Sequence, residues 1–230
     1  KMSKKIIFSS GGTGGHIFPA LSLIEYFSNK EYKVILVTDT RGIKYANKFN
    51  NIKKYIVKTD TPTNKNIFRK IISLIVIFFS VIRSIFILIK EKPNLVFGLG
   101  GYVSFPTSFA SKVLGIPLVI YENNLVLGRT NKRLLPFAKK ILFSGKVFED
   151  IPEKYKTKCF HVGNILREEI INYNATEKTD NNKIFPILIL GGSQGAEIFG
   201  KVIPPVIKMI KDKGYTIDIY QQCTLDQKDK

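Results

Sequence analysis

Cysteine is scarce in this sequence. Only two cysteines, Cys159 and Cys223, occur among the 230 residues, and they stand far apart along the chain. Such a pair gives neither a disulfide framework nor a CxxC metal site, and it fits a protein of the reducing cytoplasm. The first residues also contain no long apolar run, so the sequence predicts no signal peptide.

Two common phosphate-binding motifs are missing as well. The GxGxxG dinucleotide fingerprint fails in both N-terminal glycine clusters, because Ile17 and Val103 stand where the third glycine is needed. The P-loop-like run 195–201 is followed by Val202 instead of the Ser or Thr that would hold magnesium. That run also lies in an apolar-periodic segment that predicts a helix, so the likeness to a P-loop is a coincidence of spacing.

Acidic residues are half as frequent as basic ones. The chain has 36 Lys and Arg against 18 Asp and Glu, which gives a formal net charge of +18. A charge of this size is typical of nucleic-acid-binding proteins. However, thirty of the basic residues are lysines and they are scattered rather than gathered in one block. We therefore expect no nucleic-acid partner, and part of the charge suits an anionic membrane or substrate.

Hydrophobic residues make up 44% of the chain, enough to bury a core. Short apolar runs alternate with segments of helical periodicity, which is the pattern of βαβ units around a parallel sheet. Strands are predicted at 5–9, 33–38, 54–58, 94–98, 117–121 and 140–143, and helices at 18–29, 42–49, 66–90, 105–114 and 128–137.

A strand, a glycine loop and a helix follow one another twice in the chain. The first unit combines the run 6–8, the loop GGTGG at 11–15 and a helix with Pro19 suited to its first turn. The second begins with a strand at 187–190 and the loop 191–195. Bare amides at such helix starts bind phosphate or another anion, and the clustered glycines indicate a ligand that approaches the backbone closely.

Two such units predict two Rossmann-like domains in tandem. We expect a first domain at 1–165, a linker region at 166–182 and the start of a second domain at 183–230. This last stretch is much shorter than the roughly 100 residues that a domain usually needs. We therefore expect a fragment with an incomplete second domain, whose coding frame continues for about 100–150 residues.

Five blocks in order carry a family resemblance: GGTGGHIFPALSL, GLGGYVSFP, YENNLVLGRTNK, VGNILREEI and LGGSQGAEIFGKVIP. They resemble the signature blocks of the MurG family, peptidoglycan glycosyltransferases that transfer N-acetylglucosamine from UDP-GlcNAc. The acceptor is lipid I, an undecaprenyl-diphosphate-linked muramoyl peptide, and the product is lipid II. The resemblance implies an α/β fold of the GT-B type, with two Rossmann-like domains and parallel sheets, and with most of the family's C-terminal half missing.

The resemblance also assigns site residues. Those implied to bind UDP-GlcNAc are Thr13, Gly14, Gly15, Asn124, Arg167 and Ser193. Tyr102, in the second glycine loop, either contacts the acceptor or packs against the chain. Tyr121 replaces the family's usual histidine, which argues against a base at that position. Ile165 and Leu166 replace a Pro–Val pair and keep the apolar volume of that loop.

The implied reaction is one in-line displacement at the anomeric carbon of N-acetylglucosamine, with UDP as the leaving group. A base should take the proton of the attacking muramoyl hydroxyl, and His16 and Glu122 are the candidates. His16 could equally hydrogen-bond the loop or the acceptor phosphate. For Glu122 a salt bridge or a helix-start contact is favoured over catalysis. Helix-start amides can stabilise the leaving diphosphate, so no metal or other cofactor is expected.

The segment 66–90 is apolar and basic. It has no acidic residue, and it carries no charge between Ile71 and Ile82. This composition favours a helix on the anionic lipids of the cytoplasmic face of the inner membrane, with the protein bound peripherally. A buried crossover helix is the alternative, and a membrane span is disfavoured because the βαβ alternation continues past it. Two other functions stay open: a GT-B transferase for another acceptor, and an inactive lipid-diphosphate-binding fragment.

Overall fold

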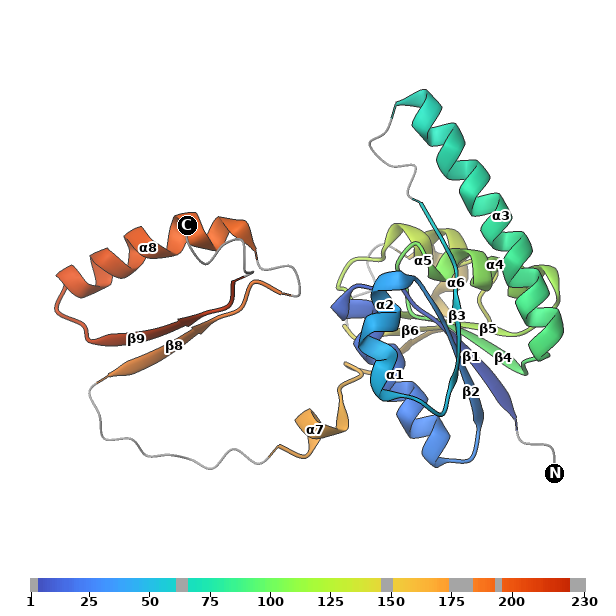
Figure 1. Cartoon of the computed structure of the whole chain (residues 1–230), viewed down its shortest axis with the longest axis horizontal. Helices are drawn as coiled ribbons and strands as arrows, with labels where there is room; N and C mark the ends of the chain where they lie inside the picture. The colour runs from blue at the N-terminus through green and yellow to red at the C-terminus, as the bar shows by residue number, and fades with distance from the viewer. Residues whose placement is uncertain (1–3, 61–65, 146–150, 174–183, 193–195, 224–230) are drawn as a thin grey trace. The chain divides into compact units, whose positions relative to one another are not determined.

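The computed structural model of the chain describes residues 4–60, 66–145, 151–173, 184–192 and 196–223 (Figure 1). The chain divides into two compact units, Lys1–Asn172 and Tyr173–Lys230. The expected linker region 166–182 therefore contributes its first residues to the first unit.

A seven-stranded sheet forms the centre of the first unit among the described residues. Its strand order is β3-β2-β1-β4-β5-β6-β7, and every neighbouring pair is parallel. The strands are β1 (Lys5–Ser9), β2 (Lys33–Thr38), β3 (Lys53–Ile56), β4 (Leu95–Gly98), β5 (Leu118–Glu122), β6 (Lys140–Phe143) and β7 (Cys159–His161). The predicted parallel sheet is thus confirmed, and β7 is an additional strand at the edge.

The chain order reverses beside β1. From β1 the chain moves outward to β2 and β3, and it then returns to place β4 on the other side of β1. In open parallel sheets, ligands bind at the carboxyl ends of the strands that flank such a reversal. The glycine loops at 10–13 and 99–103 follow β1 and β4 directly, so both lie at this position.

The helices of the first unit are α1 (Gly14–Asn29), α2 (Thr40–Tyr45), the 3₁₀ turn η1 (Ala46–Lys48), α3 (Ile67–Glu91), α4 (Ser104–Val113), α5 (Arg129–Leu134), α6 (Glu153–Lys156) and α7 (Glu168–Ile171). All five predicted helices are present, α3 and α4 within one residue of the predicted bounds, and α6 and α7 are additional. α2 starts earlier than predicted because the Asp39 carboxylate caps it, accepting from the amides of Arg41 and Gly42. α5 ends earlier because Pro136 has no amide hydrogen and cannot donate the hydrogen bond that would follow the one from Leu135 to Asn131.

The start of α1 was predicted wrongly. The helix begins at Gly14 rather than at residue 18, so Pro19 lies in its second turn and not in its first. Proline has no amide hydrogen, which frees the carbonyl four residues earlier, that of Gly15. The side chain of Asn123 supplies the missing donor, with Nδ2 3.3 Å from the Gly15 oxygen. The loop after β5 therefore compensates for the proline in α1.

Apolar residues pack on both faces of the sheet. Alternation along β1 sends Ile6 and Phe8 to one face and Ile7 to the other. Phe8 packs there with Ile17 of α1, while Ile7 packs with Leu88 of α3. Because all three β1 residues are buried, this strand fixes the two glycine loops against a rigid support.

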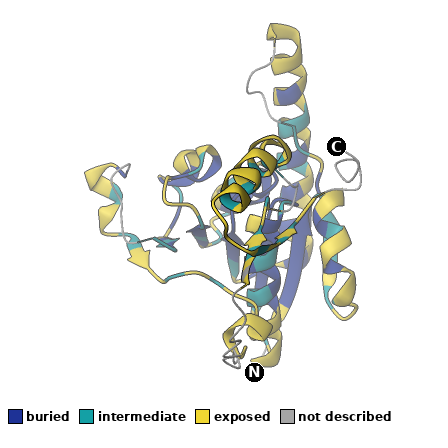
Figure 2. Cartoon of the chain, turned by 90° about the vertical axis from the view of Figure 1, so that its left-hand side faces the viewer, coloured by how far each residue is buried: buried dark blue, intermediate teal, exposed yellow. Residues whose placement is uncertain are grey.

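Much of helix α3 is exposed (Figure 2), and its exposed side is apolar, while serines lie on its buried side before the last turns. The buried serines are Ser73, Ser80 and Ser84: Ser80 donates to the carbonyl of Lys58, and Ser84 pairs with Thr107 of α4. The exposed apolar residues are Ile67, Phe68, Ile71, Ile72, Leu74, Ile75, Phe78, Phe79, Phe86 and Ile89. By length and composition α3 could also cross a membrane. Only its last turns, at Ile87 and Leu88, join the apolar core.

A buried carboxylate holds the end of α3 to the sheet. Glu91 accepts from Lys5 of β1, at 3.2 Å, and from Lys53 and Tyr55 of β3, at 2.5 Å each. Burial raises the pKa of Glu91, but these hydrogen bonds outweigh that effect and hold the pKa at about 2.

Replacement of Glu91 by glutamine should destabilise the first unit. A pKa below the usual 4.5 gives a stabilisation that is complete above that pH and disappears as the pH falls towards 2. We expect a loss on the order of 1–2 kcal/mol at pH 7, allowing for solvent screening of Lys53. Urea unfolding at pH 7 and pH 3 measures it, and the difference from the unmodified chain should shrink at pH 3. Glu153→Gln, at an exposed ion pair, is the control, and an equal loss there would refute the buried-carboxylate account.

The second unit is described by itself. Strands β8 (Phe185–Ile189) and β9 (Ile217–Gln221) pair in parallel, and α8 (Glu197–Asp212) connects them. This is a βαβ unit, as expected for the start of a second Rossmann-like domain. Gly200 and Lys201 lie inside α8, so the absence of a P-loop is confirmed for this part of the run.

Candidate active site

A cavity of about 160 Å³ opens at the carboxyl ends of the strands beside the chain reversal. It is lined by His16, Gly100, Gly101, Tyr102, Glu122, Asn124, Gly128, Arg129, Thr130 and Asn131. The structure thus brings together four of the predicted site residues, His16, Tyr102, Glu122 and Asn124. They come from the start of α1, from the loop after β4, and from the last residue of β5 and the loop that follows it.

The first two glycines of the opening loop pack against the chain itself. The Gly11 amide donates to the Gly100 carbonyl at 3.1 Å, and a Cβ on Gly11 would lie 3.1 Å from the Cα of Gly101. A Cβ on Gly12 would overlap the Asp39 carboxylate, at 2.0 Å. The prediction that glycine is needed here because a ligand approaches the backbone is therefore wrong for Gly11 and Gly12. Neighbouring loops of the chain fill the space that a side chain would need.

Gly15 has a different environment. A Cβ there would meet no atom within 4 Å, and the residue is exposed in the first turn of α1. Thr13, the residue before the helix, makes no capping hydrogen bond with its side chain. The amides of Gly14 and Gly15 precede the first intrahelical bond, but Gly14 is buried, so the Gly15 amide is the one that is open to an anion. Of the five loop residues, Thr13 and Gly15 are thus the ones that are not buried.

His16 is the histidine that lines the cavity. Its ring packs against the second glycine loop: a Cβ on Gly100 would lie 3.0 Å from Nδ1. Nδ1 is buried, and no atom of the described residues hydrogen-bonds to it. Burial lowers the pKa of His16, while the negative charge of Glu122 and a backbone contact with Leu99 oppose this effect. The ring is therefore neutral at pH 7 and can accept a proton.

Both oxygens of Glu122 are occupied by the chain itself. Oε1 accepts from the backbone and side-chain nitrogens of Asn124, at 3.0 and 2.8 Å. Oε2 accepts from the Gly128 amide at 2.8 Å and from Asn131 Nδ2 at 3.0 Å. Gly128 is the residue before α5, so this is the helix-start contact that the sequence analysis favours over catalysis. With 2% of its surface exposed, the carboxylate orders the loop that borders the cavity.

Asn131 is a cavity residue that the sequence reasoning missed. Its amide group donates to the Tyr121 carbonyl and to Glu122, both at 3.0 Å. Its Oδ1 is buried without a partner among the described residues. Together with His16 Nδ1, the cavity therefore presents two buried polar atoms that the chain leaves unsatisfied, and such atoms indicate a bound ligand or water. The signal in the sequence was the polar pair Thr130-Asn131 inside a block that carried the family resemblance.

Tyr121 has a structural role at the position where the family has histidine. Its hydroxyl lies 3.2 Å from the acceptors Asn123 Oδ1 and Gly163 O, and it accepts from the Ile165 amide. Burial raises the pKa of Tyr121, so the phenol stays protonated at neutral pH. It joins the loop after β5 to the segment that leads to Arg167.

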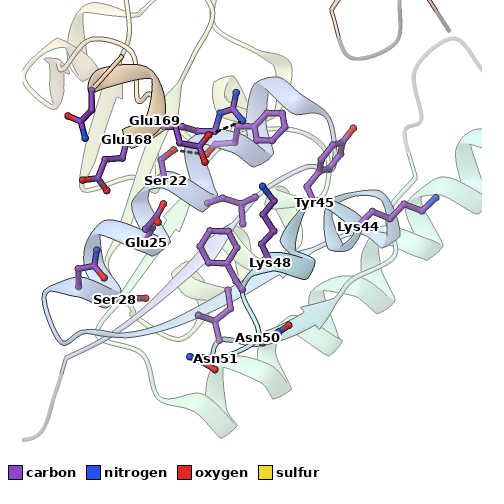
Figure 3. Close-up of a pocket in the computed structure, with 17 residues that line it drawn as sticks. Ser22, Glu25, Ser28, Lys44, Tyr45, Lys48, Asn50, Asn51, Glu168 and Glu169 are labelled. Atoms are coloured by element: carbon purple, nitrogen blue, oxygen red, sulfur yellow. Dashed lines mark hydrogen bonds and ion pairs between the residues drawn. The ribbon is translucent and has the colours of Figure 1, made fainter. Parts of the chain in front are cut away.

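Arg167 lines a separate, larger cavity of about 830 Å³ between α1, α2 and α7 (Figure 3). Its guanidinium lies 5.0 Å above the ring of Phe18, and Nη1 is 3.7 Å from the Glu169 carboxylate. Figure 3 shows Ser22 and Glu25 of α1 facing Lys48 across this cavity. The structure therefore does not bring Arg167 into the His16 cavity, and Ser193 lies outside the described residues.

Comparison with known proteins gives the family. The family model of the glycosyltransferase family 28 N-terminal domain matches residues 6–143, more than half of the chain. The chain belongs to glycosyltransferase family 28. This match spans β1 to β6 and contains all residues that line the His16 cavity.

Two curated relatives of this family 28 chain are from Rickettsia. UDP-N-acetylglucosamine--N-acetylmuramyl-(pentapeptide) pyrophosphoryl-undecaprenol N-acetylglucosamine transferase of Rickettsia canadensis is 37% identical over 229 residues, 99% of this chain and 63% of the relative. The Rickettsia bellii protein of the same name is 37% identical over 231 residues, covering 99% of this chain and 64% of the relative. The chain thus spans just under two thirds of the length of these relatives.

Solved structures agree with the family. The crystal structure of Acinetobacter baumannii MurG superposes with a TM-score of 0.71 at 26% identity, covering 98% of this chain and 62% of that one. The calicheamicin glycosyltransferase CalG4 has a TM-score of 0.64 at 12% identity, which shows the fold alone. The predicted GT-B fold class and the resemblance to the MurG family are both confirmed.

Proposed function

We propose that this family 28 chain takes part in transfer of N-acetylglucosamine from UDP-GlcNAc to the muramoyl sugar of undecaprenyl-diphosphate-linked lipid I, giving lipid II. The observation that carries the proposal is the His16 cavity, where a neutral imidazole and an unsatisfied Asn131 oxygen adjoin the open first turn of α1. The two Rickettsia relatives bear names that state this transfer. The reaction is a single displacement that inverts the anomeric carbon.

In the proposed mechanism His16 accepts the proton of the attacking muramoyl hydroxyl. Burial keeps the ring neutral at pH 7, as a general base requires. The amide of Gly15, at the start of α1, faces the diphosphate charge and stabilises it without a side-chain cation. Glu122 contacts no reacting atom in this mechanism: it holds Asn124 and the start of α5 in place.

The proposed donor contacts begin beside the His16 cavity. Asn124 lines the His16 cavity, and its carbonyl oxygen stays available because its amide group binds Glu122. Thr13 adjoins the same site through the first turn of α1. Arg167 and Ser193 complete the proposed UDP-GlcNAc contacts, and Tyr102 is assigned to the acceptor.

The exposed face of α3 supports membrane association. Phe78, Phe79 and Phe86 are each more than 60% exposed, and Arg69 and Lys70 lie on the first turns of the same helix. A helix that turns apolar residues outward and serines inward fits a lipid surface better than water. We therefore propose peripheral binding to anionic lipids of the cytoplasmic face of the inner membrane, where the lipid-linked acceptor would be found.

Charge reversal on α3 should release the chain from anionic vesicles. Each basic residue near the surface contributes about 1 kcal/mol, so Arg69→Glu with Lys70→Glu should weaken binding by at least about tenfold. Sedimentation with phosphatidylglycerol vesicles at low and high salt measures the loss. Lys208→Glu with Lys211→Glu, on α8, changes the net charge equally and should have a smaller effect. Equal release by both pairs would mean that net charge, not α3, determines binding.

A substitution at Gly15 should raise the stability of the chain and weaken its binding of the donor. Alanine there meets no neighbouring atom and favours the helix, so Gly15→Ala should stabilise the chain by about 0.5–1 kcal/mol. If a diphosphate lies against this turn, the same change should weaken UDP-GlcNAc binding. Thermal unfolding measures the change in stability, and titration calorimetry measures the change in UDP-GlcNAc affinity. Gly12→Ala is the comparison, because its overlap with Asp39 should destabilise the fold first, and unchanged donor binding in Gly15→Ala would exclude the contact.

Transfer itself can be tested in a hybrid protein. In it, this chain replaces the matching part of the Rickettsia canadensis relative, so that the His16 cavity comes from this chain. Incubation with labelled UDP-GlcNAc and lipid I should give a lipid-extractable labelled product. Transfer to another prenyl-linked or natural-product acceptor but not to lipid I would place the chain with other GT-B transferases. No transfer by a folded hybrid would contradict the proposed function.

A further inference from the structure

A second small cavity adjoins the His16 cavity. It has a volume of about 160 Å³ and shares Tyr102, Arg129 and Thr130 with the first. Its remaining lining residues are Asp60, Leu74, Ile77, Phe105 and Arg133. Because Tyr102, Arg129 and Thr130 border both cavities, the two lie next to each other.

Two guanidinium groups lie along this second cavity. Arg129 and Arg133 are one helical turn apart on α5, so they lie on the same face of the helix. Both are exposed, and neither makes an ion pair within the described part of the chain. Asp60 is the acidic residue among those that line this cavity, and its Oδ2 accepts from Ser73 of α3 at 2.8 Å. The cavity therefore offers two cationic groups to an anion.

The far wall of the cavity is apolar and leads onto α3. Leu74 and Ile77 come from the helix whose outer face carries exposed apolar residues, and Phe105 comes from α4. Leu74 is itself 58% exposed, so the wall of the cavity is continuous with that outer face. From His16 outward, the lining thus changes from polar to cationic to apolar.

We infer that this cavity binds the diphosphate and the first isoprenoid unit of a polyprenyl-diphosphate-linked acceptor. The inference rests on the proposed function for the identity of the acceptor. In that acceptor a sugar, a diphosphate and a prenyl chain follow one another, which is the order of the polar, cationic and apolar linings. Arg129 and Arg133 pair with the two phosphates, and Leu74, Ile77 and Phe105 pack against the first prenyl carbons.

A diphosphate fits this site better than the headgroup of a bulk phospholipid. Two guanidiniums one turn apart match two linked phosphates, whereas a phosphodiester offers a single charge. The cavity also shares three lining residues with the His16 cavity, where a phospholipid has no sugar to place. The lipid diphosphate is thus the occupant that uses all three parts of the lining.

Calorimetry with the 230-residue chain and farnesyl diphosphate tests this inference without a donor or turnover. Arg129→Gln with Arg133→Gln should weaken binding by at least about tenfold, because charge-assisted hydrogen bonds are lost. Lys132→Gln lies between them on α5 but does not line the cavity, so it should change binding by less than about twofold, as for an exposed charge. Thermal unfolding should show all three proteins equally folded, since these side chains are exposed.

A second arm tests the apolar wall. Inorganic diphosphate should bind more weakly than farnesyl diphosphate, and Leu74→Ser should reduce only the binding of the farnesyl ligand. Equal affinity for both ligands, or equal effects of the arginine and Lys132 variants, would overturn the inference. So would a loss of phosphatidylglycerol-vesicle binding in the arginine variants without a loss of farnesyl diphosphate binding.

These outcomes are separable from those of the proposed function. If the hybrid transfers sugar to lipid I but the arginine variants bind farnesyl diphosphate like the control, the cavity assignment fails and the function stands. If the hybrid transfers nothing but the arginine pair still determines farnesyl diphosphate binding, the cavity assignment stands and the transfer proposal fails.

Discussion

Replacement of His16 by alanine is expected to slow transfer in the hybrid enzyme by about 10²–10⁴-fold, the usual contribution of a general base. Binding of UDP-GlcNAc should change little, because the ring contacts the acceptor hydroxyl in this account. Burial lowers the pKa of His16 below its ordinary value of 6.5. The rate should therefore stay constant near pH 7 and fall only below the pH at which the ring becomes protonated.

The matched control is the other histidine of the chain. His161 is exposed on β7, and its Nε2 lies 3.1 Å from the Ser144 carbonyl. His161→Ala should leave both the rate and its pH dependence unchanged. A His16→Ala enzyme with normal turnover but weak acceptor binding would assign the ring to acceptor contact instead. If the transfer rate of His16→Ala fell at low pH in the same way as that of the unmodified enzyme, a group other than His16 would be responsible for the pH dependence.

Replacement of Glu122 by alanine should have the largest effect on stability. The change removes the acceptor of the Gly128 amide and one of the two acceptors of the Asn131 amide group in a buried site. Unsatisfied buried donors cost about 1–3 kcal/mol each, so we expect a loss of roughly 3 kcal/mol. Urea unfolding of the 230-residue chain measures it. Glu25→Ala, at an exposed position of α1, should change stability by less than about 0.5 kcal/mol.

The two variants at position 122 separate structure from catalysis. Glu122→Gln keeps the shape and one acceptor oxygen but turns an amide group towards donors, so it should recover part of the stability. If Glu122 only orders the loop, transfer should follow the folded fraction in both variants. A stable Glu122→Gln enzyme that has lost 10²-fold or more in rate would instead make this carboxylate the base.

The sequence predicted the sheet well because its strands are short, continuous apolar runs. β1, β2 and β6 begin and end at the predicted residues, since each is buried in a parallel sheet and bounded by charged or polar residues. The short elements β7, α6 and α7 are three or four residues long and carry no readable periodicity.

The orientation of side chains was harder to predict. Residues 67–91 form a helix as expected, but an almost uniformly apolar sequence does not show which face is buried. The signal was the spacing of Ser73, Ser80 and Ser84, which places three small polar residues on one stripe. At Gly11 and Gly12 the sequence indicated bare backbone correctly, but only the structure shows that neighbouring loops, not a ligand, occupy the space.

The most direct test is a crystal structure of the chain with a soluble lipid I analogue that has a short prenyl chain. The account predicts the muramoyl hydroxyl within about 3 Å of a ring nitrogen of His16, the reach of a general base. It also predicts the diphosphate beside Arg129 and Arg133. An analogue bound in the larger cavity beside Phe18 and Arg167, with nothing against His16, would contradict it.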